Sequence, residues 1–210
     1  MTKIDSLKCW IKYALFRKAR KRKDIQEFWQ KAENDNWEKY TTGIEKSIFL
    51  ANLTKKIPLR KDAKILELGC NIGRNLVCLQ SIDYTNISGV ELNKEAVKQS
   101  KKVYPKLKAK IINSTIEDFM SNNFGRYDLI FTIAVLEHIP KESEWIFQSM
   151  STHAKYIITI EDEKSINKIC FPRNYKTIFE SFGMKQIYET TCDNIHPTLT
   201  KNFKARIFRR

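Results

Sequence analysis

Between residues 64 and 182 the chain alternates short apolar segments with amphipathic helical stretches. The apolar segments are rich in β-branched residues, as is typical of strands that are buried on both faces. Five successive pairs of strand and helix predict an α/β fold, with a doubly wound, mostly parallel sheet covered by helices on both sides. The predicted strands span residues 64–68, 87–92, 109–113, 127–134 and 155–161, and the helices after them span residues 73–82, 93–103, 115–122, 142–151 and 173–182.

Two more strand patterns, residues 184–191 and 204–210, close the chain without a helix between them. They predict an antiparallel hairpin at one edge of the sheet. Ahead of the first strand lies an N-terminal helical extension, which Pro58 ends. We therefore expect an extension, residues 1–57, and one domain, residues 58–210. The helical patterns of the extension cover residues 6–20, 24–37 and 44–57.

The composition, with 42% hydrophobic and 30% charged residues, is that of an ordinary soluble protein. The five cysteines are scattered and form no C-x-x-C pair, which argues against a disulfide framework and against a zinc site. This cysteine usage is typical of a protein in the reducing cytosol. No apolar run approaches the roughly 18 residues that a membrane span requires. The first 23 residues carry charges throughout, unlike a cleaved signal peptide. These features together predict a cytoplasmic protein.

The net charge of +14 is concentrated at the two ends of the chain. Residues 1–23 hold nine lysines and arginines against one acid, and residues 201–210 hold five against none, so the chain between them is close to neutral. The charge is therefore a property of the ends and gives no general indication of nucleic-acid binding.

The stretch ILELGCNIGR, residues 65–74, joins the first strand to its helix through two glycines. Gly69 permits a tight turn where a side chain would collide with a ligand, and Asn71 is one of the few other residues that tolerates a left-handed backbone. Gly73 allows the helix to start close to the strand. The spacing is G-x-N-x-G, which differs from the G-x-G-x-x-G of a pyrophosphate-binding loop. A tight turn with a purely structural role is the alternative.

Two acids favour a ligand at this turn. Glu67 precedes the first glycine, and Glu91 ends the next strand, where an acid receives ribose hydroxyls in nucleotide-binding folds. A carboxylate suits this task because it accepts two hydrogen bonds from a vicinal diol. The alternative for Glu91 is a solvated strand end.

The stretches ILELGCNIG, GVEL, YDLIFTIAVLEHIP and YIITI together resemble the class I S-adenosylmethionine-dependent methyltransferases over residues 60–190. The resemblance implies a Rossmann-like sheet of seven strands with the seventh antiparallel, and S-adenosyl-L-methionine as the cofactor. It places the methionine part at the glycine turn, the ribose at Glu91 and the adenine after the third strand. The cofactor-binding residues that it implies are Glu67, Gly69, Cys70, Asn71, Gly73, Glu91, Leu92, Thr115, Ile116 and Ile133.

The chain departs from the family pattern at two places. Asn71 stands where the usual E-x-G-x-G-x-G has its middle glycine, and Thr115, followed by Ile116, stands where an acid usually follows the third strand. Both departures are compatible with cofactor binding, because adenine is often held by backbone amides and apolar contact.

The segment LEHIP, residues 136–140, ends the fourth strand, where such folds meet the methyl acceptor. His138 is the predicted general base for a hydroxyl acceptor, with Glu137 beside it as the second catalytic residue. In the alternative interpretation, both residues orient the loop and contact the cofactor. No metal is expected, because Ala134 replaces the first acid of the E-x-x-E-H pattern that binds a divalent metal in some relatives, although the acids at 161–163 could partly substitute.

The acceptor is predicted from absences and from a second resemblance. The D/N-P-P-Y/F motif of amino-methylating nucleic-acid enzymes and the Pro-Cys of cytosine-C5 enzymes are both missing. Residues 28–53 resemble the N-terminal helices of small methyltransferases of surface-glycan and nonulosonic-acid biosynthesis, which implies O-methylation of a sugar or another small hydroxyl acceptor. The acids at 161–163 would receive a polar, hydroxyl-rich substrate or else face solvent. The substrate-binding candidates are Tyr40, Glu161, Glu163 and Arg173.

Residues 7–23 leave three interpretations open. An apolar helical face followed by six basic residues in seven fits a helix on an anionic membrane, which would place the protein peripherally at the inner face. A lid helix with a solvated basic tail is the interpretation we favour, and contact with nucleic acid is the least favoured, because no aromatic residue interrupts the basic run.

Other functions also remain open at this point. The basic N-terminus could recruit an RNA or protein methyltransferase to its substrate. The domain could also be a non-catalytic cofactor-binding module, although the glycine turn and Glu91 argue against that. The sequence does not indicate the oligomeric state.

Overall fold

The computed structural model describes residues 21–31, 38–122, 125–167 and 169–210, and for residues 38 and 39 it describes the backbone only. The predicted helix over residues 6–20 lies outside the described residues, as does most of the segment 7–23 for which membrane contact is predicted. Within the described part of the chain, no helix is long and apolar enough to cross a membrane.

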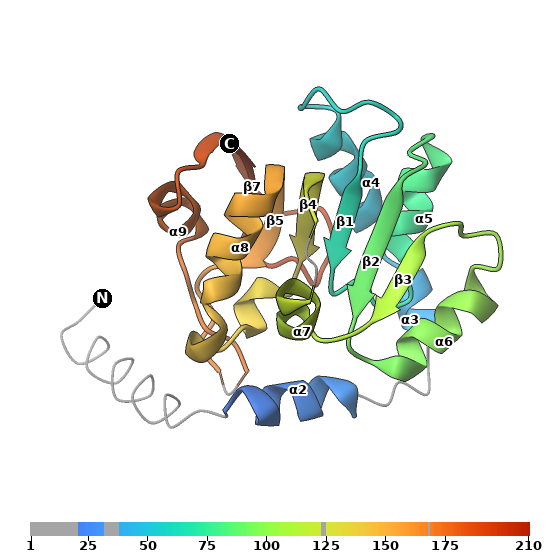
Figure 1. Ribbon diagram of the computed structural model, residues 1–210, viewed down its shortest axis with the longest axis horizontal. Helices are drawn as coiled ribbons and strands as arrows, with labels where there is room; N and C mark the ends of the chain where they lie inside the picture. The colour runs from blue at the N-terminus through green and yellow to red at the C-terminus, as the bar shows by residue number, and fades with distance from the viewer. Residues whose placement is uncertain (1–20, 32–37, 123–124, 168) are drawn as a thin grey trace.

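A single sheet of seven strands forms the centre of the molecule, in the order β3-β2-β1-β4-β5-β7-β6 (Figure 1). Strands β1 to β5 pair in parallel, and β7 runs antiparallel to both of its neighbours. This confirms the predicted doubly wound α/β sheet with an antiparallel last strand. The strands are β1 (Ile65–Leu68), β2 (Ile87–Glu91), β3 (Lys110–Asn113), β4 (Tyr127–Ile133), β5 (Ala154–Asp162), β6 (Lys185–Thr191) and β7 (Phe203–Arg209).

The predicted hairpin of the last two strands forms, but only one of its strands is at the edge. β7 inserts between β5 and β6, so that Ile158 pairs with Ile207 on one side and Tyr188 pairs with Ile207 on the other. The apolar residues of β7 explain this position, because Ala205, Ile207 and Phe208 are fully buried, whereas the side chains of β6 alternate between exposed and half-buried.

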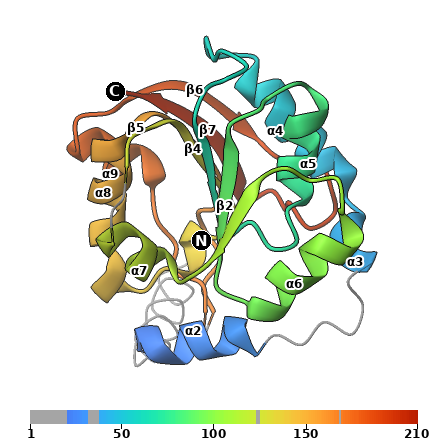
Figure 2. The ribbon, with the colours of Figure 1, turned by 45° about the vertical axis from the view of Figure 1, so that its right-hand side comes forward.

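Helices cover both faces of the sheet, as predicted for a chain that alternates strand and helix. The helices α4, α5 and α6 lie on one face, and α7, α8 and α9 lie on the other (Figure 2). The alternation of side chains along each strand divides the core accordingly: Ile65 of β1 belongs to the α4 and α5 side, and Leu66 belongs to the α8 and α9 side. The helices are α2 (Arg22–Gln30), α3 (Glu38–Thr41), α4 (Ile44–Thr54), α5 (Arg74–Ser81), α6 (Lys94–Val103), α7 (Ile116–Ser121), α8 (Trp145–His153) and α9 (Tyr175–Ser181), with short 3-10 turns η1 (Leu136–His138) and η2 (Lys141–Ser143).

Helix α2 belongs to neither covering layer. It crosses the edge of the sheet at which the parallel strands end, at the bottom of the view in Figure 1. The ligand site of an open parallel sheet lies at this edge, so α2 covers the predicted site.

Candidate active site

The turn after β1 is built from left-handed residues. Gly69, Asn71 and Gly73 have φ angles of 71°, 49° and 85°, which confirms the left-handed conformation predicted for Asn71. A Cβ added at Gly69 would lie 2.5 Å from Cγ2 of Val135. The predicted reason for this glycine was collision with a ligand. The structure gives a different one, because the space a side chain would need is occupied by Val135 from the turn after β4.

The carboxylate of Glu91 connects the turn after β1 with the turn after β2. Its Oε2 accepts a hydrogen bond from the amide of Asn71 at 2.8 Å, and its Oε1 accepts one from the amide of Asn93 at 2.8 Å. The side chain is 8% exposed, and this burial raises the pKa of Glu91. Each carboxylate oxygen accepts more than one hydrogen bond, so Glu91 retains acceptor capacity for a diol.

Glu67 is buried at the end of β1 with half of its carboxylate free. Oε1 accepts a hydrogen bond from Nδ2 of Asn75 at 2.6 Å, whereas Oε2 has no partner among the described residues. Burial raises the pKa of Glu67 to about 8. Asn75 in turn accepts from the hydroxyl of Ser47 at 2.6 Å, which fixes α5 against α4. Ser47 and Asn75 were not anticipated as site residues, since each is an ordinary polar residue of a helix.

The remaining cofactor candidates take different positions around this edge. Cys70 is 3% exposed, and its sulfur packs against Gly89 of β2, where an added Cβ would be 2.5 Å away, so its side chain faces the core. Thr115 caps α7, its hydroxyl accepting from the amide of Asp118 at 3.0 Å. Leu92 and Ile133 are half-buried at the ends of β2 and β4, and Ile116 is half-buried at the start of α7. Their contact with a cofactor stays a prediction.

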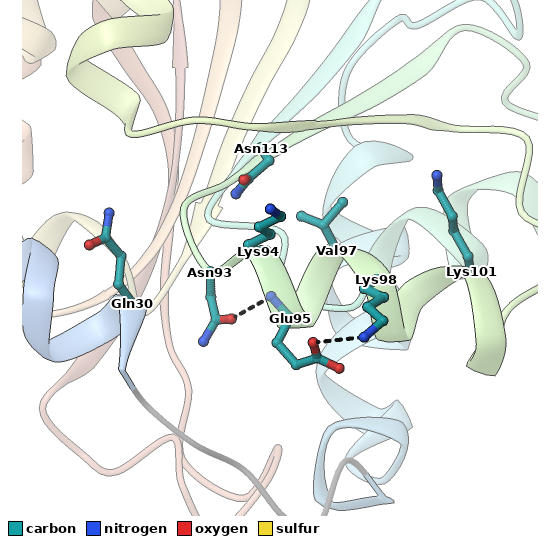
Figure 3. Close-up of a pocket in the computed structure, with 8 residues that line it drawn as sticks. All are labelled: Gln30, Asn93, Lys94, Glu95, Val97, Lys98, Lys101 and Asn113. Atoms are coloured by element: carbon teal, nitrogen blue, oxygen red, sulfur yellow. Dashed lines mark hydrogen bonds and ion pairs between the residues drawn. The ribbon is translucent and has the colours of Figure 1, made fainter.

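A pocket of about 590 Å³ opens beside the ends of β2 and β3. Figure 3 shows Asn93 and Lys94 at the start of α6, Lys98 and Lys101 further along that helix, and Gln30 across from them on α2. The amides of Glu95 and Ala96 at the start of α6 already donate to Oδ1 of Asn93, at 3.0 and 3.1 Å. Because the pocket lies beside the ends of β2 and β3, it adjoins the predicted adenine end of the site. This pocket was not anticipated from the sequence. Its lining residues are Gln30, Asn93, Lys94, Glu95, Val97, Lys98, Lys101 and Asn113.

His138 sits in η1, immediately after β4. Its Nδ1 lies 2.8 Å from the carbonyl oxygen of Ile169, so in the neutral ring Nδ1–H donates and Nε2 carries the free lone pair. Nε2 lies 3.5 Å from Oε1 of Glu137. Burial lowers the pKa of His138, which keeps the ring neutral near pH 7.

Glu137 faces the interior beside this imidazole. Its Oε2 accepts a hydrogen bond from the amide of Asp162 at 2.6 Å, which attaches η1 to the end of β5. Burial is the main cause that raises the pKa of Glu137 to about 7. The two predicted catalytic residues are therefore adjacent, and burial raises the pKa of Glu137 while it lowers the pKa of His138.

Glu161 holds the turn that carries both residues. Its Oε2 accepts hydrogen bonds from the amides of Val135 at 2.9 Å and Glu137 at 3.3 Å. Between β4 and these amides, Ala134 has a φ of 55°, a strained conformation for a residue with a side chain. Glu161 is fully buried and bonded to these amides, so we infer that it positions η1 and does not face the substrate.

The other substrate-binding candidates are already engaged. Arg173 donates to Oε1 of Glu144 at 3.1 Å and to the carbonyl of Ile139 at 2.6 Å, which ties it to the segment after η1. Glu163 forms a buried ion pair with Arg206 of β7, at 2.7 Å. Tyr40 lies on α3, where its carbonyl accepts from Arg74 at 3.4 Å. A role of these residues in substrate binding stays a prediction.

Trp29 of α2 was not anticipated as a site residue. Its ring packs on the imidazole of His138, with a centroid separation of 4.7 Å. Asn93 donates to the carbonyl of Trp29 at 3.2 Å, so the same residue also contacts the cap of α6. The aromatic pattern of residues 28–29 was visible in the sequence, but nothing in it indicated a partner more than 100 residues away.

One set of groups with metal-binding chemistry meets among the described residues. The ligand atoms of Glu137, His138 and Cys170 lie within 4.8 Å of one another. The imidazole nitrogen nearest the sulfur, Nδ1 at 3.7 Å, is already bonded to the Ile169 carbonyl, and burial raises the pKa of the Cys170 thiol to about 11. The cluster fits a hydrogen-bonded support for His138, and the absence of a metal stays a prediction.

Comparison with known proteins assigns the chain to a family. A family model described as a methyltransferase domain matches residues 13–167. The chain belongs to this family. The predicted resemblance to class I S-adenosylmethionine-dependent methyltransferases is thereby confirmed, although the narrower resemblance to glycan-biosynthesis enzymes is untested. A search of curated proteins found no match.

Solved methyltransferase structures share the fold. A methyltransferase from Leishmania major that depends on S-adenosylmethionine has a TM-score of 0.66 at 14% identity, covering 89% of this chain and 82% of its own. Magnesium protoporphyrin IX methyltransferase from Synechocystis, solved with S-adenosylhomocysteine bound, has a TM-score of 0.65 at 13% identity and covers 90% and 98%. The methyltransferase domain of a bacterial Hen1 protein has a TM-score of 0.63 at 15% identity and covers 80% and 98%.

The cofactor of this methyltransferase is S-adenosylmethionine, and the site's chemistry fits it. Glu91 presents a rigid carboxylate with free acceptor capacity for ribose hydroxyls, and the orphaned Oε2 of Glu67 is a buried acceptor that suits an ammonium group. The left-handed turn of residues 69–73 brings backbone, without side chains at the two glycines, to the same edge. When bound, the cofactor supplies an electrophilic methyl group on a sulfonium.

Proposed function

We propose that this methyltransferase O-methylates a sugar or another small hydroxyl-bearing acceptor, in the biosynthesis of surface glycans. The observation that carries the hydroxyl assignment is the state of His138. A hydroxyl is a weak nucleophile until its proton is removed. His138 bonds to the Ile169 carbonyl through Nδ1, which leaves the lone pair of Nε2 to accept that proton, and burial, which lowers its pKa, favours the neutral ring. The sugar class is supported by the resemblance of residues 28–53 to glycan-biosynthesis enzymes.

In this proposal the residues of the chain divide the work. Glu67, Glu91 and the glycine turn hold and orient the cofactor, since positioning supplies much of the catalysis of an in-line displacement. The acceptor oxygen forms its bond to the methyl group as the sulfonium–carbon bond breaks, and its proton passes to Nε2 of His138. Oε1 of Glu137, 3.5 Å from Nε2, stabilises the imidazolium that results.

Cofactor binding should release a proton from Glu67. In the free protein the pKa of Glu67 is about 8, so its carboxyl is mostly protonated at pH 7. An ammonium beside Oε2 favours the ionised form and lowers that pKa, so affinity for S-adenosylhomocysteine should increase as pH rises towards 8 and then level off.

Calorimetric titrations with S-adenosylhomocysteine at pH 7, in buffers of different ionisation enthalpy, measure this proton directly. We expect close to one proton released by the native protein and none by Glu67→Gln. In addition, Glu67 makes the free energy of unfolding fall as pH rises from 4.5, the ordinary pKa of a glutamate, to about 8, its pKa in the folded protein. In this range the folded protein retains a proton that the unfolded chain has lost. Equal proton release by both proteins would show that Glu67 does not meet the cofactor.

The proposed reaction is tested by incubating the protein with S-adenosylmethionine and a probe panel. The panel contains methyl α-D-glucopyranoside, N-acetylneuraminic acid, uridine diphosphate N-acetylglucosamine and a short single-stranded RNA. Mass spectrometry should detect a methyl ether on at least one sugar, with S-adenosylhomocysteine formed in equal amount. Methylation of the RNA alone, or of none of the panel by a protein that binds the cofactor, would contradict the proposal.

A further inference from the structure

Helix α2 spans the two halves of the active site. Figure 2 shows it running from the side of α7 to the side of α6, beneath the carboxyl ends of the strands. Its polar contacts agree with this placement, because they reach η2, α7 and the cap of α6. These contacts are the amide of Arg22 to the carboxylate of Glu142, Nε2 of Gln26 to Oε2 of Glu117 at 3.2 Å, and Nδ2 of Asn93 to the carbonyl of Trp29 at 3.2 Å.

The attachment of α2 is weak in comparison with the other helices. Of its nine residues, Ile25 alone is buried, and Phe28 remains 42% exposed. Trp29 packs on His138 but is itself only half-buried, and of the three hydrogen bonds one is exposed and two are partly buried. Opening of this helix therefore requires far less free energy than unfolding of the domain.

Trp29 has a buried donor without an acceptor. Its Nε1 is enclosed by protein and has no hydrogen-bond partner among the described residues. A buried donor left unpaired destabilises the folded state, and buried tryptophans usually satisfy this group. The ring that carries the donor lies against His138, the predicted base, so the orphaned N–H belongs to a residue that contacts the acceptor end of the site.

We propose that α2 is a lid that closes over the methyl acceptor, and that Trp29 binds the acceptor by donating a hydrogen bond from Nε1 to one of its oxygens. An aromatic ring with a polar N–H matches a sugar, which presents an apolar face of ring C–H groups and oxygens around its edge. The inference rests on the proposed function and adds to it that the acceptor carries a second oxygen besides the one that is methylated.

Arg173 supports an uncharged acceptor group at this position. Its guanidinium is 7% exposed and is occupied by Glu144 and by the carbonyls of Leu136, Ile139 and Phe171. The cation beside η1 is therefore not available to bind a phosphate or a carboxylate. A single neutral N–H satisfies a lone pair of a hydroxyl or ring oxygen, whereas it would leave the charge of a phosphate or a carboxylate uncompensated.

The test compares Trp29→Phe, which keeps an aromatic ring and removes the N–H, with Trp145→Phe, which makes the same change at an exposed position of α8. With the sugar of the probe panel that is methylated, Trp29→Phe should raise KM about tenfold, the equivalent of one hydrogen bond, with kcat changed less than twofold. The affinity for S-adenosylhomocysteine should be unchanged in both variants.

Nuclear magnetic resonance of protein labelled with 15N-tryptophan provides a readout that does not depend on turnover. The indole signal that Trp29→Phe removes should shift when a panel sugar is added to the protein with S-adenosylhomocysteine bound. Methylation of a sugar without this shift, and with an unchanged KM for Trp29→Phe, would overturn the lid contact and leave the proposed function intact. A shift without methylation of any sugar would overturn the proposed function and leave the contact of Trp29 with the sugar intact. The failure of one proposal can therefore be distinguished from the failure of the other.

Discussion

His138→Ala is expected to lower turnover of a hydroxyl acceptor by roughly 10²–10⁴-fold, the contribution of a positioned general base. The affinity for S-adenosylhomocysteine should change little, because the imidazole is bonded to the Ile169 carbonyl and takes no part in the turn that holds Glu91. Steady-state kinetics and calorimetry on the same preparation measure both quantities.

The pH dependence of the native enzyme provides a second view of the same residue. Turnover should increase with pH as His138 loses its proton, with a midpoint below the ordinary value of 6.5, because burial lowers its pKa. His153→Ala, at the end of α8, is the matched control and should behave as the native protein. Loss of cofactor affinity in His138→Ala with turnover preserved at saturation would instead identify His138 as an orienting residue.

Gly69→Ala should weaken cofactor binding by about tenfold or more and lower the free energy of unfolding by about 1–3 kcal/mol. An alanine at a φ of 71° is strained, and its Cβ would lie 2.5 Å from Cγ2 of Val135. The turn must therefore shift, and the amide of Asn71 that bonds to Glu91 shifts with it. Calorimetry with S-adenosylhomocysteine and urea unfolding measure the two effects.

The double variant Gly69→Ala/Val135→Ala separates strain from collision. Removing the Val135 methyl groups relieves the contact but leaves the left-handed alanine, so we expect partial recovery, with a residual cost of about 1–2 kcal/mol. Val135→Ala alone serves as the reference for the cycle. No recovery in the double variant would show that backbone strain alone explains the glycine.

The elements of the domain were predictable because their signals are local. Apolar strands followed by amphipathic helices place β1 to β5 within two residues of their predicted bounds. The positive φ of Asn71 and the position of Glu91 beside the glycine turn follow from short motifs as well. The family resemblance implied an antiparallel seventh strand, but the insertion of β7 between β5 and β6 was not predicted, since hydrophobic pattern alone does not give the order of strands.

The supports of the site were not predictable, because they depend on contacts between distant segments. The side chain that requires a glycine at position 69 is Val135, 66 residues further along the chain. Glu161 accepts hydrogen bonds from the amides of Val135 and Glu137, whereas we expected from the sequence that the acids at 161–163 face solvent or bind substrate. Trp29 meets His138 only because α2 returns over the carboxyl ends of the strands. Valine, glutamate and tryptophan also occur elsewhere in the chain, so the residue type alone does not indicate these roles.

The most direct test of the cofactor site is a calorimetric titration of the native protein and of Glu91→Ala with S-adenosylhomocysteine. Hydrogen bonds to a charged group contribute about 1.5–3 kcal/mol, so the account predicts saturable binding by the native protein and affinity roughly 10- to 150-fold lower in the variant. Lys102→Ala, at an exposed position of α6 that does not line the pocket, should bind as the native protein does. Absence of binding by the native protein, or equal affinity in Glu91→Ala, would contradict the placement of the cofactor at the ends of β1 and β2.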